Sequence, residues 1–259
     1  MIFAATFTAC AGPHNYVQPS GPRYSECYEA VADTTEIRVV TFNIQFSREI
    51  DKAITLLTTA PDLRGADILM LQEMDAAGAH QIAFALGMCY VYYPATIHPS
   101  SGRDFGNAIL SRWPITNDRK IILPHNGRFG RTQRIAVTGT VTIRGHEIQI
   151  YSLHLATWVE VTFNHRKDQA RAVLEDARRG PHLVIVGGDL NSHDVGDVFS
   201  ENGFAWPTNH QGRTAKTGDL DHIFLRGLSL VDSTSTGMIR DNEGASDHRP
   251  VWIVLRPPE

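Results

Sequence analysis

Short runs of apolar residues, each followed by polar residues, form the main pattern of this chain. The clearest run, residues 183–186, leads into residues 187–191, which are two glycines followed by Asp189, Leu190 and Asn191. Four successive apolar residues are too few for a buried helix and are typical of a strand buried on both faces. The glycines allow the backbone to approach its neighbours closely. Taken alone, an Asx turn after a buried strand explains these residues equally well.

The same pattern recurs along the chain. Strands are predicted at residues 37–44, 66–73, 89–95, 105–111, 134–143, 147–155, 183–189, 219–225, 228–234 and 251–255. Helices are predicted at residues 50–59, 76–86, 161–179 and 194–201. Hairpins, and helices that are interspersed instead of strictly alternating with strands, favour mixed sheets over a parallel Rossmann or barrel fold.

Polar side chains lie at the ends of five predicted strands, and a sixth strand contains an acid. They are Asn43, Glu73, His154, Asp189 with Asn191, Asp247 with His248, and Asp221. Carboxylate and amide oxygens suit Mg²⁺, which keeps several waters of its own. The three cysteines are too scattered for a zinc cluster. The pattern favours metal-assisted attack by water, a chemistry that suits phosphate esters.

Length, composition and charge narrow the function classes. The chain has 259 residues, which suits one large domain, and its 42% hydrophobic and 20% charged content is ordinary for a globular protein. A net charge of -4 argues against a general nucleic-acid coat. Residues 103–134 carry seven Lys or Arg and two Asp, which fits either a local basic cleft or a solvated loop face.

The first ten residues invite comparison with a secretory leader. Residues 1–9 are apolar and too few to span a bilayer. Thr8, Ala9 and Cys10 resemble the end of a bacterial lipobox, with Phe7 where Leu is usual. Export, or attachment to the cell envelope as a lipoprotein, is slightly favoured over a cytoplasmic location, although no positively charged region precedes the apolar residues.

The domain division follows from the same change in composition. Residues 1–35 are predicted to form a leader and tether, and residues 36–259 the folded domain. If Cys10 carried lipid, Cys27 and Cys89 would remain as a possible pair.

Seven motifs, in order, resemble those of the endonuclease/exonuclease/phosphatase superfamily. They occupy residues 41–45, 71–73, 106–111, 152–155, 188–191, 220–224 and 246–251. The resemblance covers roughly residues 37–256. It implies an α+β fold, a four-layer α/β/β/α sandwich of two packed mixed sheets flanked by helices, with the active site at one edge of the sheets. It also implies a metal-dependent hydrolase of phosphate esters.

The resemblance assigns one group of residues to the metal and the water. Glu73 would be the main metal carboxylate, with Asn43 and Asp247 near the same ion. Asp189 and Asn191 would hold the attacking water or the phosphate. The implied ion is Mg²⁺ or Mn²⁺, with Ca²⁺ as a candidate structural ion. Asn43 could instead only close a turn.

A second group is assigned to the phosphate and to proton transfer. His248 would pair with Asp221, which would fix the tautomer of the imidazole. His154 would donate to a phosphate oxygen, and Arg134 would contact the phosphate. Asn107 would either contact substrate or brace the site. Whether His248 or the carboxylate after the two glycines is the base stays open.

Three functions are compatible with these residues. The leading one is a Mg²⁺-dependent phosphodiesterase acting on nucleic acid, working as a monomer without an obligate protein partner. A phospholipid or sugar-phosphate esterase, sphingomyelinase-like or inositol-phosphatase-like, would use the same chemistry. A catalytically silent binding module is disfavoured, because binding alone would not require His248 and Asp221 together.

Overall fold

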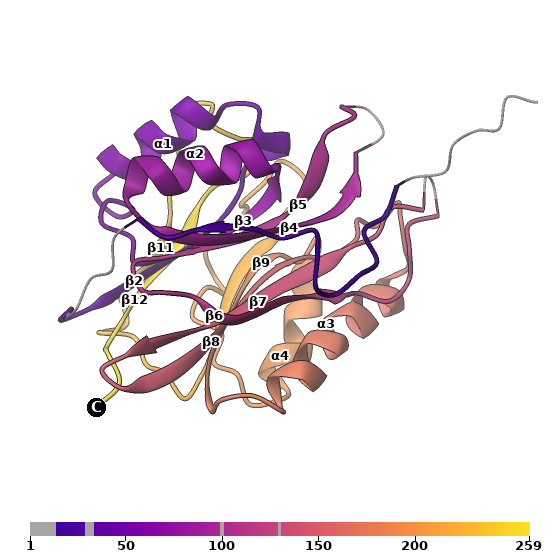
Figure 1. Ribbon diagram of the computed structural model, residues 1–259. Coiled ribbons are helices and arrows are strands. Elements are labelled where there is room, and N and C mark those ends of the chain that lie inside the picture. The colour runs from indigo at the N-terminus through magenta and orange to yellow at the C-terminus, as the bar shows by residue number, and fades with distance from the viewer. Residues whose placement is uncertain (1–13, 29–33, 99–100, 129–130) are drawn as a thin grey trace, which may run out of the picture.

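Two mixed β-sheets pack face to face, and helices cover the outer face of each (Figure 1). The computed structural model describes residues 14–28, 34–98, 101–128 and 131–259. The predicted four-layer α/β/β/α sandwich is therefore confirmed.

The first sheet has seven strands in the order β1-β4-β5-β3-β2-β12-β11. The strands are β1 (Tyr24–Glu26), β2 (Ile37–Asn43), β3 (Ile68–Met74), β4 (Cys89–Ile97), β5 (Asp104–Ser111), β11 (Thr236–Met238) and β12 (Val251–Leu255). β2 and β3 are parallel and the other pairs are antiparallel. Helices α1 (Ile50–Thr59) and α2 (Ala76–Leu86) bury Leu56, Leu57 and Ile82 against this sheet. The short η1 helix (Gln45–Ser47) follows β2.

The second sheet has five strands in the order β10-β9-β8-β7-β6. The strands are β6 (Thr116–Ile122), β7 (Ile135–Ile143), β8 (His146–His154), β9 (Leu183–Asp189) and β10 (Asp221–Arg226). Only β8 and β9 are parallel. Helices α3 (Phe163–Ala177) and α4 (Asp197–Ser200), with η2 (His193–Gly196), cover its outer face.

The main core lies between the two sheets. Val39 and Met70 from the first sheet pack with Ile150 and Ile185 from the second, all fully buried. Strands covered on both faces need apolar side chains at nearly every position, which explains their continuous apolar runs. A Cβ on Gly187 would lie 2.3 Å from Met70 Cε, so a glycine is needed there for the sheets to come this close.

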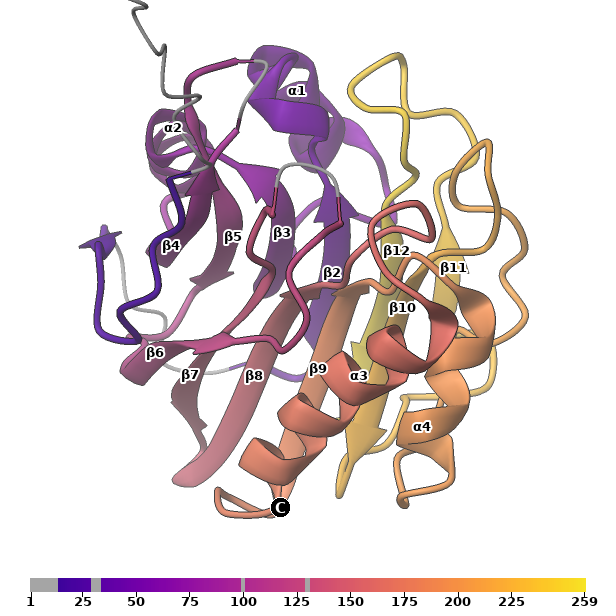
Figure 2. The ribbon, with the colours of Figure 1, turned by 90° about the vertical axis from the view of Figure 1, so that its right-hand side faces the viewer.

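The carboxyl ends of β2, β3, β8 and β9 meet at one edge of the sandwich, at the top of Figure 2. Within each pair, a crossover through an outer helix makes the strands parallel: α1 joins β2 to β3, and α3 joins β8 to β9. The chain therefore brings its predicted site residues to a single edge.

Most predicted elements are present, but one strand is wrong. Residues 228–234 form no strand and contribute only an isolated bridge between Leu230 and Leu255. The neighbouring strand is β11, which follows them. β6 was not predicted, because it is a partly exposed edge strand that mixes polar and apolar residues.

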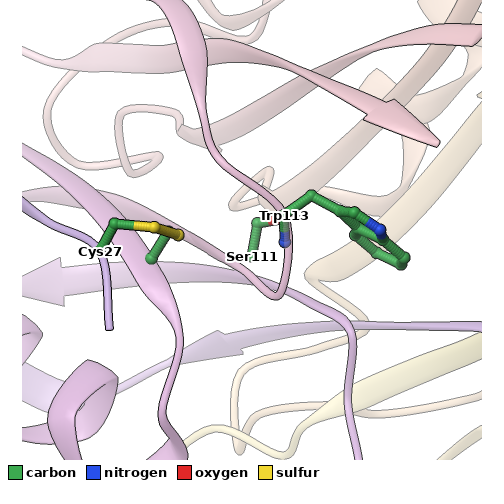
Figure 3. The surroundings of a disulfide bond; sticks show 4 residues. Cys27, Ser111 and Trp113 are labelled. Carbon is green, nitrogen blue, oxygen red and sulfur yellow. A yellow bond between two sulfur atoms is a disulfide. The ribbon is translucent and has the colours of Figure 1, made fainter. Parts of the chain in front are cut away.

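Residues 14–28 lie against the domain, which differs from the expectation of a free tether. β1 pairs with β4 and forms one edge of the first sheet, and the Tyr16 hydroxyl donates to Asp104 at 2.9 Å. A disulfide joins Cys27 to Cys89, beside Ser111 (Figure 3). These contacts join residues that are far apart in the sequence, so no local pattern of apolar and polar residues predicts them. Residues 1–13, with the lipobox-like sequence, lie outside the described residues. Among the helices of the described ranges, none is long and apolar enough to cross a membrane.

Candidate active site

Asn43, at the end of β2, holds together two carboxylates that come from different sheets. Its side chain is fully buried, and Nδ2 donates to Glu73 Oε1 and to Asp189 Oδ2, both at 3.1 Å. Its Oδ1 accepts from the backbone N–H of Gln45 at 3.1 Å. The turn contact that sequence alone allowed is therefore present together with contacts to both acids.

Glu73 lies on a β-bulge that directs it into the site. The pairing of β3 with β5 shifts register between Leu71 and Met74, and Glu73 has a positive φ of 58°. This backbone conformation costs of order 1–3 kcal/mol for a residue other than glycine. Because strands place successive side chains on opposite faces, a bulge is what allows Glu73 to turn toward the edge.

Asp189, the last residue of β9, is almost completely buried. The two glycines before it let β9 pass close to its neighbours: a Cβ on Gly188 would lie 1.9 Å from the carbonyl oxygen of Leu153. Asp189 Oδ1 accepts from the backbone N–H of Asn191 at 2.8 Å. Asn191, with a φ of 50°, donates Nδ2 to the carbonyl of Leu155 at 2.9 Å. The loop after β9 is thus fixed to the end of β8.

The two carboxylates share a site that strongly disfavours negative charge. Burial raises the pKa of Glu73, and the nearby Asp247 raises it further. Burial raises the pKa of Asp189 to about 7, which the charge of His248 only partly offsets. No Lys or Arg in the described ranges forms an ion pair with either acid. A divalent cation would supply the missing positive charge, so the residues fit a hard metal ion.

Asp221 and His248 form the predicted pair. His248 Nδ1 lies 2.8 Å from Asp221 Oδ2, and Asp221 is fully buried at the start of β10. The Thr214 hydroxyl also donates to Asp221 Oδ2, at 2.6 Å. These two contacts fix the carboxylate and direct Nε2 of the imidazole toward Asp189 Oδ2, 3.9 Å away.

His248 carries a positive charge in this setting. Burial alone would lower its pKa, but the carboxylates of Asp221 and Asp189 together raise the pKa of His248 to about 10. An imidazolium cannot accept a proton. A carboxylate whose pKa is near 7 is partly ionised at neutral pH and can accept one. The electrostatics therefore favour Asp189 over His248 as the base.

His154, at the end of β8, is buried and neutral. Its Nε2 lies 3.5 Å from Asp189 Oδ2. Burial lowers the pKa of His154 well below its usual value, and the charges of Arg134 and His248 lower it further. Arg134 Nη1 lies 3.0 Å from each ring nitrogen of His154, and its Nη2 donates to Glu160 at 2.7 Å. Arg134 thus lies beside His154, and its contact with a phosphate stays a prediction.

The remaining two predicted residues lie at different depths. Asn107 is buried and donates Nδ2 to the carbonyls of Ile135 at 3.0 Å and Ser152 at 3.2 Å, so it braces the first sheet against the second. Asp247 is exposed beside the site, next to the buried Ser246. A contact of either residue with substrate or metal stays a prediction.

Sequence reasoning missed three residues that position this site. The Ser246 hydroxyl donates to the carbonyl of Asn43 at 2.7 Å and accepts from the N–H of His248 at 3.1 Å. Thr214 holds Asp221, and Glu160 holds Arg134. Ser246 lies within one of the motifs and could have been found there. Thr214 and Glu160 carry no local signal.

The site opens into a cavity of about 550 Å³. Its lining includes the catalytic candidates Glu73, His154, Asp189, Asn191 and His248. Trp158 and Val159 lie on its rim and are 73% and 47% exposed. The cavity therefore offers a polar floor and one apolar wall.

A metal could also be held by a second combination of donors. Ligand atoms of Asp189, Asp221 and His248 all lie within 4.8 Å of one another. Donor type and separation suit a metal ion, but Asp221 already accepts from both His248 and Thr214. Glu73 accepts a hydrogen bond from the uncharged Asn43, and the charges of Arg134 and His248 only partly offset the effect of burial on its pKa. Glu73 therefore has the greater need of a cation.

Residues 40–248 match the sequence profile of the Endonuclease/Exonuclease/phosphatase family. The chain belongs to this family. Members of the family are metal-dependent hydrolases of phosphate esters, and the chain is a hydrolase of this class. No curated protein matches the sequence.

Solved structures of the endonuclease/exonuclease/phosphatase family share this fold. The family protein from Beutenbergia cavernae DSM 12333 is 21% identical, with a TM-score of 0.69 over 86% of this chain and 72% of that one. TDP2 from D. rerio, complexed with a single-strand DNA product, is 18% identical, with a TM-score of 0.65 over 86% and 100%. The human Nocturnin catalytic domain with bound sulfate is 18% identical, with a TM-score of 0.66 over 94% and 100%.

Proposed function

We propose that this protein is a divalent-metal-dependent phosphodiesterase, with nucleic acid as its first-choice substrate. The observation that carries the proposal is that a pair of buried carboxylates and a carboxylate–histidine pair lie together at one edge of the sandwich. Glu73 and Asp189 supply buried oxygen donors bridged by Asn43, and the Asp221–His248 pair lies beside them. The first part suits a divalent metal ion, and the second can hold or neutralise charge during attack by water on a phosphodiester.

Glu73 is proposed as the main metal ligand, with Asn43 and Asp247 near the same ion. Mg²⁺ or Mn²⁺ suits this oxygen-rich set. When bound, such an ion supplies positive charge to the phosphoryl oxygens and to the leaving oxygen.

The side chains of Asp189, His248 and His154 have different roles in the reaction. Asp189 takes a proton from water, whose oxygen attacks phosphorus while the ester P–O bond breaks. The leaving oxygen takes up a proton from solvent and departs as an alcohol. The imidazolium of His248, held by Asp221, neutralises charge on the phosphoryl group. Neutral His154 donates its single N–H to a nonbridging oxygen, with Arg134 beside it.

Nucleic acid is proposed because TDP2, which shares the fold, was seen with a single-strand DNA product. The alternative is a lipid ester, which the exposed Trp158 and Val159 at the rim favour. Either substrate would use the same polar floor.

A panel assay tests the proposal. Bis-p-nitrophenyl phosphate, DNA and sphingomyelin would each be incubated with Mg²⁺, with Mn²⁺ and with EDTA. We expect hydrolysis of the first two substrates with either metal and none in EDTA. Hydrolysis of sphingomyelin alone would transfer the proposal to the lipid ester, and full activity in EDTA would refute the metal assignment.

A further inference from the structure

A second cavity, of about 420 Å³, lies next to the active site and is basic. Its lining contains four cationic side chains, Arg213, Lys216, Arg240 and Arg249, against two carboxylates, Asp241 and Asp247. The whole chain has a net charge of -4, so this local excess of positive charge runs against the average. We call it the basic cavity.

The cations of the basic cavity are available for a ligand. Arg213, Lys216 and Arg240 are exposed. Across the described ranges, none of these three side chains forms an ion pair or a hydrogen bond. Arg249 donates Nη1 to the carbonyl of Arg213 at 2.7 Å, which helps to fix that segment.

The basic cavity and the active-site cavity share their walls. Ala215 bridges to His248, and the Arg249 N–H donates to the carbonyl of Thr214 at 2.8 Å. In each of these two paired segments, consecutive residues line different cavities. Lys216 and Asp247 line the basic cavity, whereas Thr217 and His248 line the active-site cavity. The two cavities therefore lie side by side, separated by a single layer of chain.

Before a metal ion binds, the active-site cavity has more carboxylates than positive charges, even with the imidazolium of His248, and would repel a substrate with many negative charges. Four carboxylates line it, those of Glu73, Asp189, Asp194 and Asp219. Positive potential in an adjoining cavity offsets this repulsion and raises the local concentration of an anionic substrate.

We propose that the basic cavity is a subsite for a second phosphate of the substrate, next to the scissile one along a nucleic-acid strand. The proposal rests on the proposed function and adds that the substrate carries more than one phosphate. A lipid surface is the less suitable occupant. Of the large exposed apolar side chains in the described ranges, none lines the basic cavity, whereas surface binding to lipid uses such side chains beside the cations.

The test compares one variant with a control of equal charge. The variant combines Arg213→Ala, Lys216→Ala and Arg240→Ala. The control combines Arg171→Ala, Arg178→Ala and Arg179→Ala, three exposed residues on or just after α3 that line neither cavity. The variant and the control each lose three positive charges. A difference between them therefore cannot come from the change in net charge. Thermal unfolding would first establish that both proteins are folded.

The readout is the ratio of kcat/KM for a single-stranded DNA oligonucleotide to kcat/KM for bis-p-nitrophenyl phosphate, which has one phosphate. We expect the variant to lower this ratio on the order of tenfold at low salt. The slope of log kcat/KM for the oligonucleotide against log salt should become shallower by about 2, because each lost contact with a single strand removes ~0.7. The control should keep the wild-type ratio and slope.

Three results would overturn the subsite. The first is a variant with the wild-type ratio and slope. The second is a wild type that hydrolyses bis-p-nitrophenyl phosphate but not the oligonucleotide, which leaves the phosphodiesterase proposal intact. The third is an unchanged ratio combined with lost binding to anionic vesicles, which would assign the cavity to lipid. A wild type inactive on both substrates would instead refute the proposed function.

Discussion

Replacing Asp221 by Asn should make the activity sensitive to alkaline pH. The carboxylates of Asp221 and Asp189 raise the pKa of His248 to about 10 against the opposing effect of burial. The wild type therefore keeps the imidazolium throughout the neutral range. Asn keeps the shape of Asp221 but removes its charge, so the pKa of His248 falls toward the ordinary value of about 6.5.

The size of the effect follows from the fraction of protonated histidine. At a pKa of about 6.5, about 3% of the imidazole is protonated at pH 8 and about 75% at pH 6. If catalysis needs the imidazolium, Asp221→Asn should lose up to about 30-fold at pH 8 and little at pH 6 from this cause. A further loss of activity that is the same at every pH would add to this pH-dependent loss, because Asn holds the imidazole ring of His248 less firmly than Asp does.

The assay is kcat/KM for bis-p-nitrophenyl phosphate between pH 6 and pH 9 at saturating Mg²⁺, expressed as variant over wild type. Asp176→Asn is the matched control, since Asp176 pairs with Arg119 at 2.6 Å and does not line the active-site cavity. NMR titration of the His248 ring in the metal-free protein would measure its pKa directly. A ratio that is flat with pH would mean that Asp221 acts only on structure or on metal. A ratio well above one, falling toward one as the pH approaches 10, would identify neutral His248 as the base and refute the assignment of Asp189.

Four further outcomes are expected. Glu73→Gln should lower turnover by orders of magnitude and raise the metal concentration needed for half-activity; an unaffected enzyme would remove Glu73 from the metal site. The losses in His154→Ala and His248→Ala should multiply in the double variant, since the two act on the phosphate separately, and a double variant no worse than either single one would show a single unit. Burial lowers the pKa of His222 to about 4, so as the pH falls below about 6.5 the unfolded chain takes up a proton on this histidine before the folded protein does. Relative to His222→Gln, the wild type should therefore lose up to about 3 kcal/mol of unfolding free energy by pH 4 in denaturant titrations. The same pH dependence of the unfolding free energy in both proteins would contradict this. Cys27→Ser should cost about 4 kcal/mol of unfolding free energy, since the disulfide closes a loop with a sequence separation of 62, and an unchanged midpoint in urea would show that the bond adds no stability.

The apolar pattern alone predicted most helices and strands and a mixed arrangement of the sheets, whereas the four-layer packing was implied by the family resemblance. Helices α1 and α2 begin and end at the predicted residues, because their apolar spacing and their Pro or Gly boundaries are local features. Strands buried on both faces were equally clear from their continuous apolar runs. The prediction failed where a strand was short or at an edge, at β1, β6 and β11, since partly exposed edge strands need no strict apolar pattern.

The site was predicted as a set of residues, but only the tertiary structure decided how they are connected. Polar side chains at strand ends are visible in the sequence, and parallel strands bring such ends to one edge. The bulge at Glu73, by contrast, depends on register with β5. The roles of Thr214 and Glu160 depend on side chains that meet across loops. The charge of His248 depends on burial and on two acids from another sheet, and these are distances that no local sequence pattern contains.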